Sequence, residues 1–286
     1  MVTTRIFVFS LLAMLAFAGN SLLCRLALTH TSIDAASFTS IRIASGALVL
    51  WLIVRVRDGS FRVDGNWFSA FVLFAYAAGF SFSYVSLPVG TGALLLFAAV
   101  QATMITYGLY AGERLQKRQV AGLLLAFAGL VYLLLPGVST PPIDSALLML
   151  GAGVAWGVYS LRGRNAGDAV RATAGNFIRA VSFSTVLSVV FLSHVSVDAL
   201  GLGYALSSGA LASGLGYVVW YMAVRGLQAT SAATVQLSVP VIAAVSGVVI
   251  LDEPTTLRLF LASIAILGGI VLVIFYRQNV KVSRTD

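Results

Sequence analysis

Charged residues are scarce in this sequence. Only 10% of the 286 residues are Asp, Glu, Lys or Arg, whereas 59% are hydrophobic. Soluble domains carry about 25% charged residues, so this chain has too few polar groups to cover its own surface in water. The shortage excludes a soluble globular protein and indicates a chain that lies in a lipid bilayer.

The residues of catalytic and metal sites are also few. One cysteine, Cys24, excludes an intrachain disulfide, and no Cys, His and carboxylate groups stand at metal-ligand spacing. The sequence contains no Gly-x-Ser-x-Gly elbow, His-Glu-x-x-His pair or Walker loop. We therefore expect neither enzymatic activity nor a cofactor.

What the chain does contain is a series of long apolar runs. A helix that crosses the hydrocarbon takes roughly 20 apolar residues, and uninterrupted runs favour helices over a β-barrel, whose strands alternate. The first run also resembles a signal peptide, but it continues to Leu23 and nine more runs follow. The sequence predicts an all-α integral membrane protein with ten spans: 6–23, 37–54, 68–87, 91–110, 120–135, 145–160, 172–191, 200–224, 231–251 and 257–276.

Basic residues are concentrated on one side of these spans. The opposite loops hold only Arg25 and Arg258. Since basic loops stay in the cytoplasm, both termini are predicted to be cytoplasmic, and the net charge of +8 reports orientation in a plasma (inner) membrane rather than nucleic-acid binding. The fourteen basic residues on the cytoplasmic side are Arg5, Arg55, Arg57, Arg62, Arg114, Lys117, Arg118, Arg162, Arg164, Arg171, Arg225, Arg277, Lys281 and Arg284.

The two halves of the chain, residues 1–136 and 137–286, resemble each other. Offsets of 137 to 140 residues match several positions in order, among them Arg42 with Arg179, Glu113 with Glu253 and Gly129 with Gly269. Each half holds five predicted helices, an odd number, so the second half must enter the membrane from the opposite face. Inverted repeats of this kind are common in transporters, where the substrate site lies near the midplane between them.

These motifs resemble the drug/metabolite transporter superfamily in its ten-helix EamA-type branch. The first half has Gly112-Glu113-Arg114-Leu115 before a helix with Gly122 and Gly129, and the second has Pro240, Asp252-Glu253-Pro254 and Gly268-Gly269. Val100 departs from the branch by standing where the first half would carry a proline. Within the branch, the aromatic and hydroxyl content looks most like the aromatic amino acid exporters (YddG-like). The resemblance implies export of small metabolites by alternating access.

Polar and aromatic side chains within the spans are the candidates for a substrate site. Belts of interfacial aromatics and hydroxyls that join helices are the alternative explanation, and belts fit Tyr84, Trp220 and Tyr221, which we place near cytoplasmic ends. Deeper donors are costly to bury without partners, which favours a central cavity. The predicted site comprises Asn20, Tyr76, Phe80, Ser83, Tyr84, Gln101, Trp156, Tyr159, Ser160, Tyr217, Trp220 and Gln236.

Arg42 and Arg179 are the only charges predicted within spans. Because an arginine at a helix centre costs about 2.5–3.5 kcal/mol on insertion scales, we expect each to reach a helix end and bond backbone carbonyls, or else to act as a gate. A phosphorylated substrate would need clustered basic residues, which the spans lack.

We therefore expect a monomeric transporter that exports small metabolites, with amino acids, including aromatic ones, as the leading substrates. Exporters of hydrophobic drugs and channel-like pores are the alternatives. All ten acidic residues lie in loops or at span ends, and Glu113 and Glu253 lie where capping explains them. Because proton-coupled carriers commonly use a buried carboxylate, we expect no obligatory proton coupling.

Overall fold

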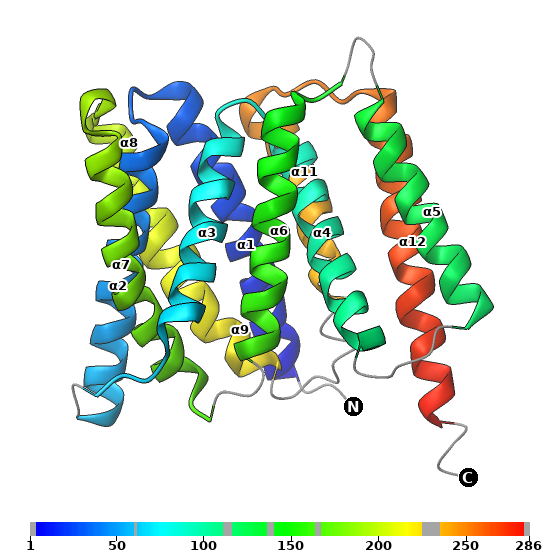
Figure 1. Cartoon of the computed structure of the whole chain (residues 1–286), viewed down its shortest axis with the longest axis horizontal. Coiled ribbons are helices and arrows are strands. Elements are labelled where there is room, and N and C mark those ends of the chain that lie inside the picture. Colours follow the sequence, from blue (N-terminus) through cyan, green and yellow to red (C-terminus); the bar gives the residue numbers. More distant parts are fainter. Residues whose placement is uncertain are drawn as a thin grey trace.

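The computed structural model describes residues 4–59, 62–110, 116–135, 140–163, 167–224 and 235–282, with side chains described up to residue 272. All the regular secondary structure of these residues is helical (Figure 1). Eight stretches are long and apolar enough to cross a membrane, and two shorter apolar stretches, Ser238–Leu251 and Leu257–Leu272, complete ten spans. The bounds are α1 Thr4–His30, α2 Ala35–Asp58, α3 Trp67–Tyr84, α4 Val89–Tyr110, α5 Lys117–Leu134, α6 Ile143–Gly163, α7 Ala169–Val190, η1 Leu192–His194, α8 Ala199–Ser207, η2 Ser208–Leu215, α9 Gly216–Val224, α11 Ser238–Leu251 and α12 Leu257–Val282.

The two five-helix halves are inverted, as the sequence predicts. In Figure 1, α1 begins and α12 ends at the lower face, whereas α6, the first helix of the second half, begins at the upper face. We call the lower face cytoplasmic, following the distribution of basic residues, and the upper face outer. The prediction of an all-α, ten-span membrane protein is confirmed.

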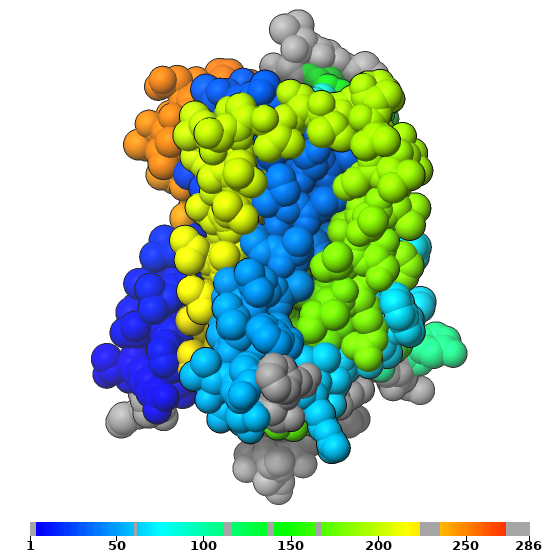
Figure 2. All heavy atoms as spheres, turned by 90° about the vertical axis from the view of Figure 1, so that its left-hand side faces the viewer, coloured from blue at the N-terminus to red at the C-terminus, as the bar shows by residue number. Residues whose placement is uncertain are grey.

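Helices of the two halves alternate around the centre of the molecule. α1 contacts α8, η2, α9 and α11 of the second half, and α4 lies between α6 and α11. Figure 2 shows α2 lying between α7 on one side and the α8–η2–α9 span on the other. Any change in the angle between the halves therefore alters the contacts at the centre.

Carboxylates fix the outer helix ends. The Asp34 side chain caps α2 by accepting from the Ala36 and Ser37 backbone N–H groups, and its second oxygen accepts from the Ser196 backbone. Partial burial alone would raise the pKa of Asp34, but hydrogen bonds from Ser37 and Ser196 outweigh it and hold that pKa below its usual value. Asp198 caps α8 in the same way and also accepts from Ser32. These bonds join the first outer loop to the loop before α8.

Two elements differ from the sequence-based expectation. α1 continues to His30, so Arg25 lies within a helix rather than in a loop. The eighth span is not one regular helix, because its middle, Ser208–Leu215, is a π-helix. There Gly209 packs so closely on α2 that a Cβ would collide with the Arg42 carbonyl and the Ser45 hydroxyl. Short π-helical insertions frequently mark functional positions.

The topology can be tested with single cysteines in a Cys24→Ala background. Arg57→Cys and Lys117→Cys, at exposed cytoplasmic positions, should resist a membrane-impermeant maleimide in intact cells and react after permeabilisation. Asp144→Cys, exposed at the start of α6, should react in intact cells. Labelling of Lys117→Cys from outside would contradict the orientation.

Candidate substrate-binding site

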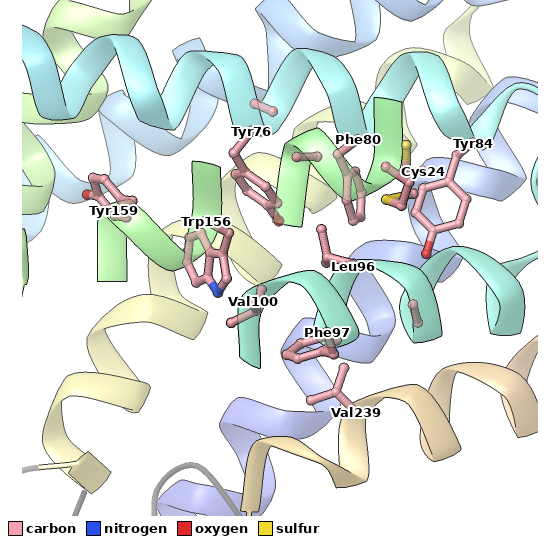
Figure 3. Packing of buried hydrophobic residues seen from close by; sticks show 14 of the residues in the cluster. Cys24, Tyr76, Phe80, Tyr84, Leu96, Phe97, Val100, Trp156, Tyr159 and Val239 are labelled. Atoms are coloured by element: carbon pink, nitrogen blue, oxygen red, sulfur yellow. The ribbon is translucent and has the colours of Figure 1, made fainter. Parts of the chain in front are cut away.

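A row of aromatic rings runs through the middle of the protein, formed by α3 and α6. Figure 3 shows Tyr84, Phe80, Tyr76, Trp156 and Tyr159 following one another along this row. Successive ring centroids are 4.7 Å apart for Phe80–Tyr84, 5.5 Å for Tyr76–Phe80, 4.8 Å for Tyr76–Trp156 and 5.8 Å for Trp156–Tyr159. All five side chains are buried. We call this set the aromatic row.

A small central cavity lies beside the middle of the aromatic row. Its volume is about 20 Å³, which is room for about one water molecule. Helices of both halves enclose the cavity, and aromatic rings from both halves form part of its wall. The lining residues are Phe17, Asn20, Ser21, Tyr76, Phe80, Leu96, Phe97, Trp156, Ala212, Ser213 and Tyr217.

Arg42 lies next to this cavity and is only 2% exposed. Its Nε donates to the Ser213 hydroxyl at 3.2 Å and its Nη2 to the Tyr76 hydroxyl at 3.1 Å. The guanidinium carbon lies 5.2 Å from the Tyr76 ring centroid and 4.9 Å from that of Phe80, within cation–π range. The prediction that Arg42 reaches a helix end is therefore wrong, because hydroxyls and ring faces solvate it in the protein interior. Among the described residues it is the one buried charged side chain.

The π-helix η2 presents two hydroxyls to the first half. Ser213 accepts from Arg42, and the Ser208 hydroxyl donates to the Asn20 side-chain oxygen at 2.6 Å. Both serines are buried. The extra residue per turn in η2 therefore places polar groups against α1 and α2 at the centre of the molecule.

Several buried polar atoms here have no hydrogen-bond partner. Within the described part of the chain they are Arg42 Nη1, the Tyr217 hydroxyl, Gln101 Nε2 and the Ser10 hydroxyl. Buried polar groups are nearly always bonded to protein or ordered water. The Arg42 and Tyr217 atoms lie at the central cavity or directly behind its wall, which marks this region as one able to accept a polar ligand.

A second and larger cavity, of about 250 Å³, lies toward the cytoplasmic ends of α3, α6, α7 and α9. Within its wall, Arg162 Nε donates to Ser69 at 2.9 Å and the Asn176 amide donates to the Tyr159 hydroxyl at 3.4 Å. Tyr159 thus borders this cavity at one end of the aromatic row, and we call it the cytoplasmic cavity. Its lining is Gly65, Asn66, Ser69, Tyr159, Arg162, Gly163, Ala169, Ala172, Thr173, Asn176 and Tyr221.

Arg179 lies near the same face and donates to the backbone carbonyls of Asp64 and Gly175, at 2.8 and 2.9 Å. The expectation that this arginine bonds backbone carbonyls is confirmed, although Arg179 lies in the middle of α7 rather than at its end. The repeat-related pair Arg42 and Arg179 therefore have different surroundings, one in the interior and one beside the cytoplasmic loop.

The outer end of the aromatic row is closed by an ion pair. Arg25 Nε lies 3.3 Å from Glu253 Oε1, and its Nη1 donates to the carbonyls of Tyr84 and Val85. The other Glu253 oxygen accepts from the Val89 backbone N–H at 2.7 Å, at the start of α4. We call this network the outer closure. It connects α1, the α3–α4 turn and the segment after α11.

The outer closure corrects one expectation and agrees with another. Tyr84 lies at the outer end of α3, because α3 starts at the cytoplasmic face; its predicted cytoplasmic position is wrong, and it is fully buried rather than part of a lipid-facing belt. Glu253 caps a helix as expected, whereas Glu113 lies outside the described residues.

The structure distributes the predicted site residues over several places. Asn20, Tyr76, Phe80, Trp156 and Tyr217 line the central cavity, and Tyr159 lines the cytoplasmic cavity. The other six line neither cavity. Ser83 donates to the Gly79 carbonyl of its own helix, the Tyr84 carbonyl belongs to the outer closure, and Trp220 packs on Phe17. Gln101 and Gln236 are buried and Ser160 is half-buried, all three outside both linings.

Sequence reasoning missed Phe17 and Ser21 of the central cavity, and Asn66, Arg162 and Asn176 of the cytoplasmic one. Phe17 contacts the rings of Trp156, Tyr217 and Trp220 at centroid distances of 5.9 to 6.2 Å. Asn176 is a polar residue within an apolar run, so the criterion that selected the other candidates also identifies it as a cavity residue.

Comparison with known proteins agrees with this architecture. The family described as the EamA-like transporter family matches residues 4–135 and again residues 145–275. This chain belongs to that family. It is therefore a multi-pass membrane transporter and not an enzyme.

Individual relatives agree with the family assignment. The uncharacterized protein PA1977 of Pseudomonas aeruginosa is 54% identical over 94% of each chain. The threonine/homoserine exporter RhtA of Escherichia coli is 28% identical over 83% of this chain and 81% of its own. The "Probable terminal-alkyne amino-acid exporter" of Streptantibioticus cattleyicolor is 28% identical over 68% of this chain and 67% of its own. One crystal structure shares the fold at 19% identity, with a TM-score of 0.66 and coverage of 94% and 96%.

The central cavity predicts a clear effect of Trp156. Trp156→Leu removes ring contacts with Phe17, Tyr76, Tyr159 and Tyr217, so transport should fall by about tenfold or more while membrane expression stays near normal. Trp67→Leu is the matched control, since Trp67 is 58% exposed at the start of α3. Equal transport by both variants would show that Trp156 only fills space.

The outer closure predicts the behaviour of Cys24, a fully buried neighbour of Arg25 on α1. Glu253→Gln removes the charge that Arg25 faces, and a hydrogen bond to a charged group contributes about 1.5–3 kcal/mol. Labelling of Cys24 by an impermeant thiol reagent from outside should therefore accelerate by about tenfold. Asp144→Asn, an exposed acid on the same face, should leave the rate unchanged. If the two variants are labelled equally slowly, Glu253 does not hold the outer face closed.

Proposed function

We propose that this protein exports small metabolites, namely amino acids including aromatic ones, across the plasma membrane by alternating access. The observation that carries the proposal is the enclosed central cavity, formed by both inverted halves and separated from the outer face by the outer closure. In this state the larger hollow lies on the cytoplasmic side, where a substrate for export is taken up. The halves, residues 1–136 and 137–286, then move relative to each other within a single monomer.

The chemistry of the wall supports this substrate class. Aromatic rings with a few hydroxyl and amide groups suit a ligand that has an apolar part and a polar head. The names of two relatives, a threonine/homoserine exporter and an amino-acid exporter, point in the same direction. Once the cavity has widened, the side chain of an aromatic amino acid stacks on the aromatic row.

Counterflow in proteoliposomes tests the proposal. Vesicles loaded with unlabelled threonine or phenylalanine should take up the same labelled amino acid from outside, with saturation and with stimulation by substrate on the far side. Flux that neither saturates nor responds to substrate on the far side would indicate a channel-like pore. Transport of hydrophobic dyes without any amino acid counterflow would favour a drug exporter instead.

The absence of a buried acid generates a prediction about energy coupling. Among the described residues no Asp or Glu is buried; Glu113 and Asp286 lie outside them. Proton-coupled carriers commonly use a buried carboxylate, and the described part of the interior offers none. With equal substrate on both sides, an imposed pH gradient should therefore drive no net accumulation of a zwitterionic amino acid. Accumulation that a protonophore abolishes would contradict this.

A further inference from the structure

The surroundings of Arg42 leave its charge without a counter-ion. Its bonded partners are two neutral hydroxyls, those of Ser213 and Tyr76, and none of the ion pairs in the described part of the chain includes it. A charge in a membrane protein interior is costly and ordinarily pairs or serves function. Ring faces and hydroxyls offset part of that cost, but they do not neutralise the charge.

The donor that Arg42 leaves unused is in a favourable place for a ligand. Among the residues that the structure describes, Nη1 has no hydrogen-bond partner, and neither has the nearby hydroxyl of Tyr217. Three side chains that contact Arg42, namely Tyr76, Phe80 and Ser213, line the central cavity, as does Tyr217. The guanidinium therefore lies directly behind the cavity wall, held in orientation by the two rings and two bonds.

The balance of charge selects among ligands. An arginine fork matches a carboxylate with two parallel bonds, whereas a phosphate dianion would leave charge uncompensated beside a single cation. The cavity wall is also suited to an ammonium group, because Phe17 and Trp156 line it and ring faces attract cations. The Asn20 amide oxygen, which accepts one bond from Ser208, has a second lone pair to offer. A carboxylate with an ammonium group close beside it describes an α-amino acid, in which one carbon carries both groups.

We propose that Arg42 binds the carboxylate of the transported substrate, with the Tyr76 and Tyr217 hydroxyls as neutral partners, so that the protein selects monocarboxylates over the corresponding amides and amines. This inference rests on the proposed amino acid export and specifies how it is achieved. Since the central cavity has room for only about one water molecule, the carboxylate binds after the halves have moved apart and widened it.

The test compares an acid with its uncharged counterpart. Native protein in proteoliposomes should carry out counterflow of phenylalanine or threonine, and the acid should compete far better than its carboxamide. In Arg42→Gln the half-saturation concentration for the acid should rise about ten- to hundredfold, the effect of losing hydrogen bonds to a charged group, and the preference for acid over amide should disappear. Arg42→Lys keeps the charge but not the fork, and should retain the preference with weaker binding.

Arg179→Gln is the matched control, because the repeat relates Arg179 to Arg42 while its guanidinium bonds backbone carbonyls away from the central cavity. It should keep both the acid affinity and the preference. Size-exclusion profile and helical circular dichroism identify a misfolded variant, and Arg42→Lys then decides the question. Acid counterflow in native protein that Arg42→Gln or Arg42→Lys leaves unchanged overturns this inference alone. No acid counterflow in native protein overturns the proposed function and this inference together.

Discussion

The buried charge of Arg42 constrains the centre of the protein more than any other single group. In a medium of low dielectric constant a guanidinium requires hydrogen-bond acceptors and ring faces around it in fixed positions. The Tyr76 and Phe80 rings meet this requirement from α3, and Ser213 meets it from η2. Ser213 reaches Arg42 because η2 is π-helical and because Gly209 allows η2 to approach the α2 backbone. One charge thus determines which residues can stand at the junction of the two halves.

The outer and cytoplasmic ends of the molecule are related by the repeat but differ in structure. The 137-residue offset that relates Arg42 to Arg179 also relates Phe80 to Tyr217 and Tyr84 to Tyr221. Tyr84 is fully buried beneath the outer closure, whereas Tyr221 lines the cytoplasmic cavity. An inverted repeat allows the two ends to exchange between a closed and an open condition, since equivalent tyrosines lie at both ends. The Arg25–Glu253 pair is present at the outer end and biases the structure toward closure there.

Sequence reasoning succeeded where a property is summed over many residues. Hydropathy over about 20 residues identifies spans, and the distribution of basic loops sets a single orientation for all of them. It was less successful where one contact between distant segments decides the outcome. The first example is the π-helix, where Gly209 approaches Arg42 and Ser45 closely. The second is Arg42 itself: the cost of burying it was taken from insertion into lipid, whereas hydroxyls and rings surround it in the protein.

The predicted site residues also include both correct and incorrect assignments. Asn20, Tyr76, Phe80, Trp156 and Tyr217 were selected because they are polar or aromatic within apolar runs, and they do line one cavity. Ser83 was selected by the same criterion, but it bonds the Gly79 carbonyl one turn earlier. A hydroxyl in a membrane helix can satisfy itself on its own backbone, so residue type alone does not separate cavity residues from self-bonded ones.

The single charge also bears on the energetics of the proposed cycle. If Arg42 binds the substrate carboxylate, a zwitterionic amino acid adds no net charge, and the centre has the same charge when loaded as when empty. The membrane potential, worth about 2.3 kcal/mol per elementary charge at 100 mV, would then act equally on the outward and the return step. With no buried carboxylate among the described residues to carry a proton, the direction of net transport would be set by the amino acid gradient itself. Such a carrier releases an amino acid when the cell holds it in excess and requires no other ion to do so.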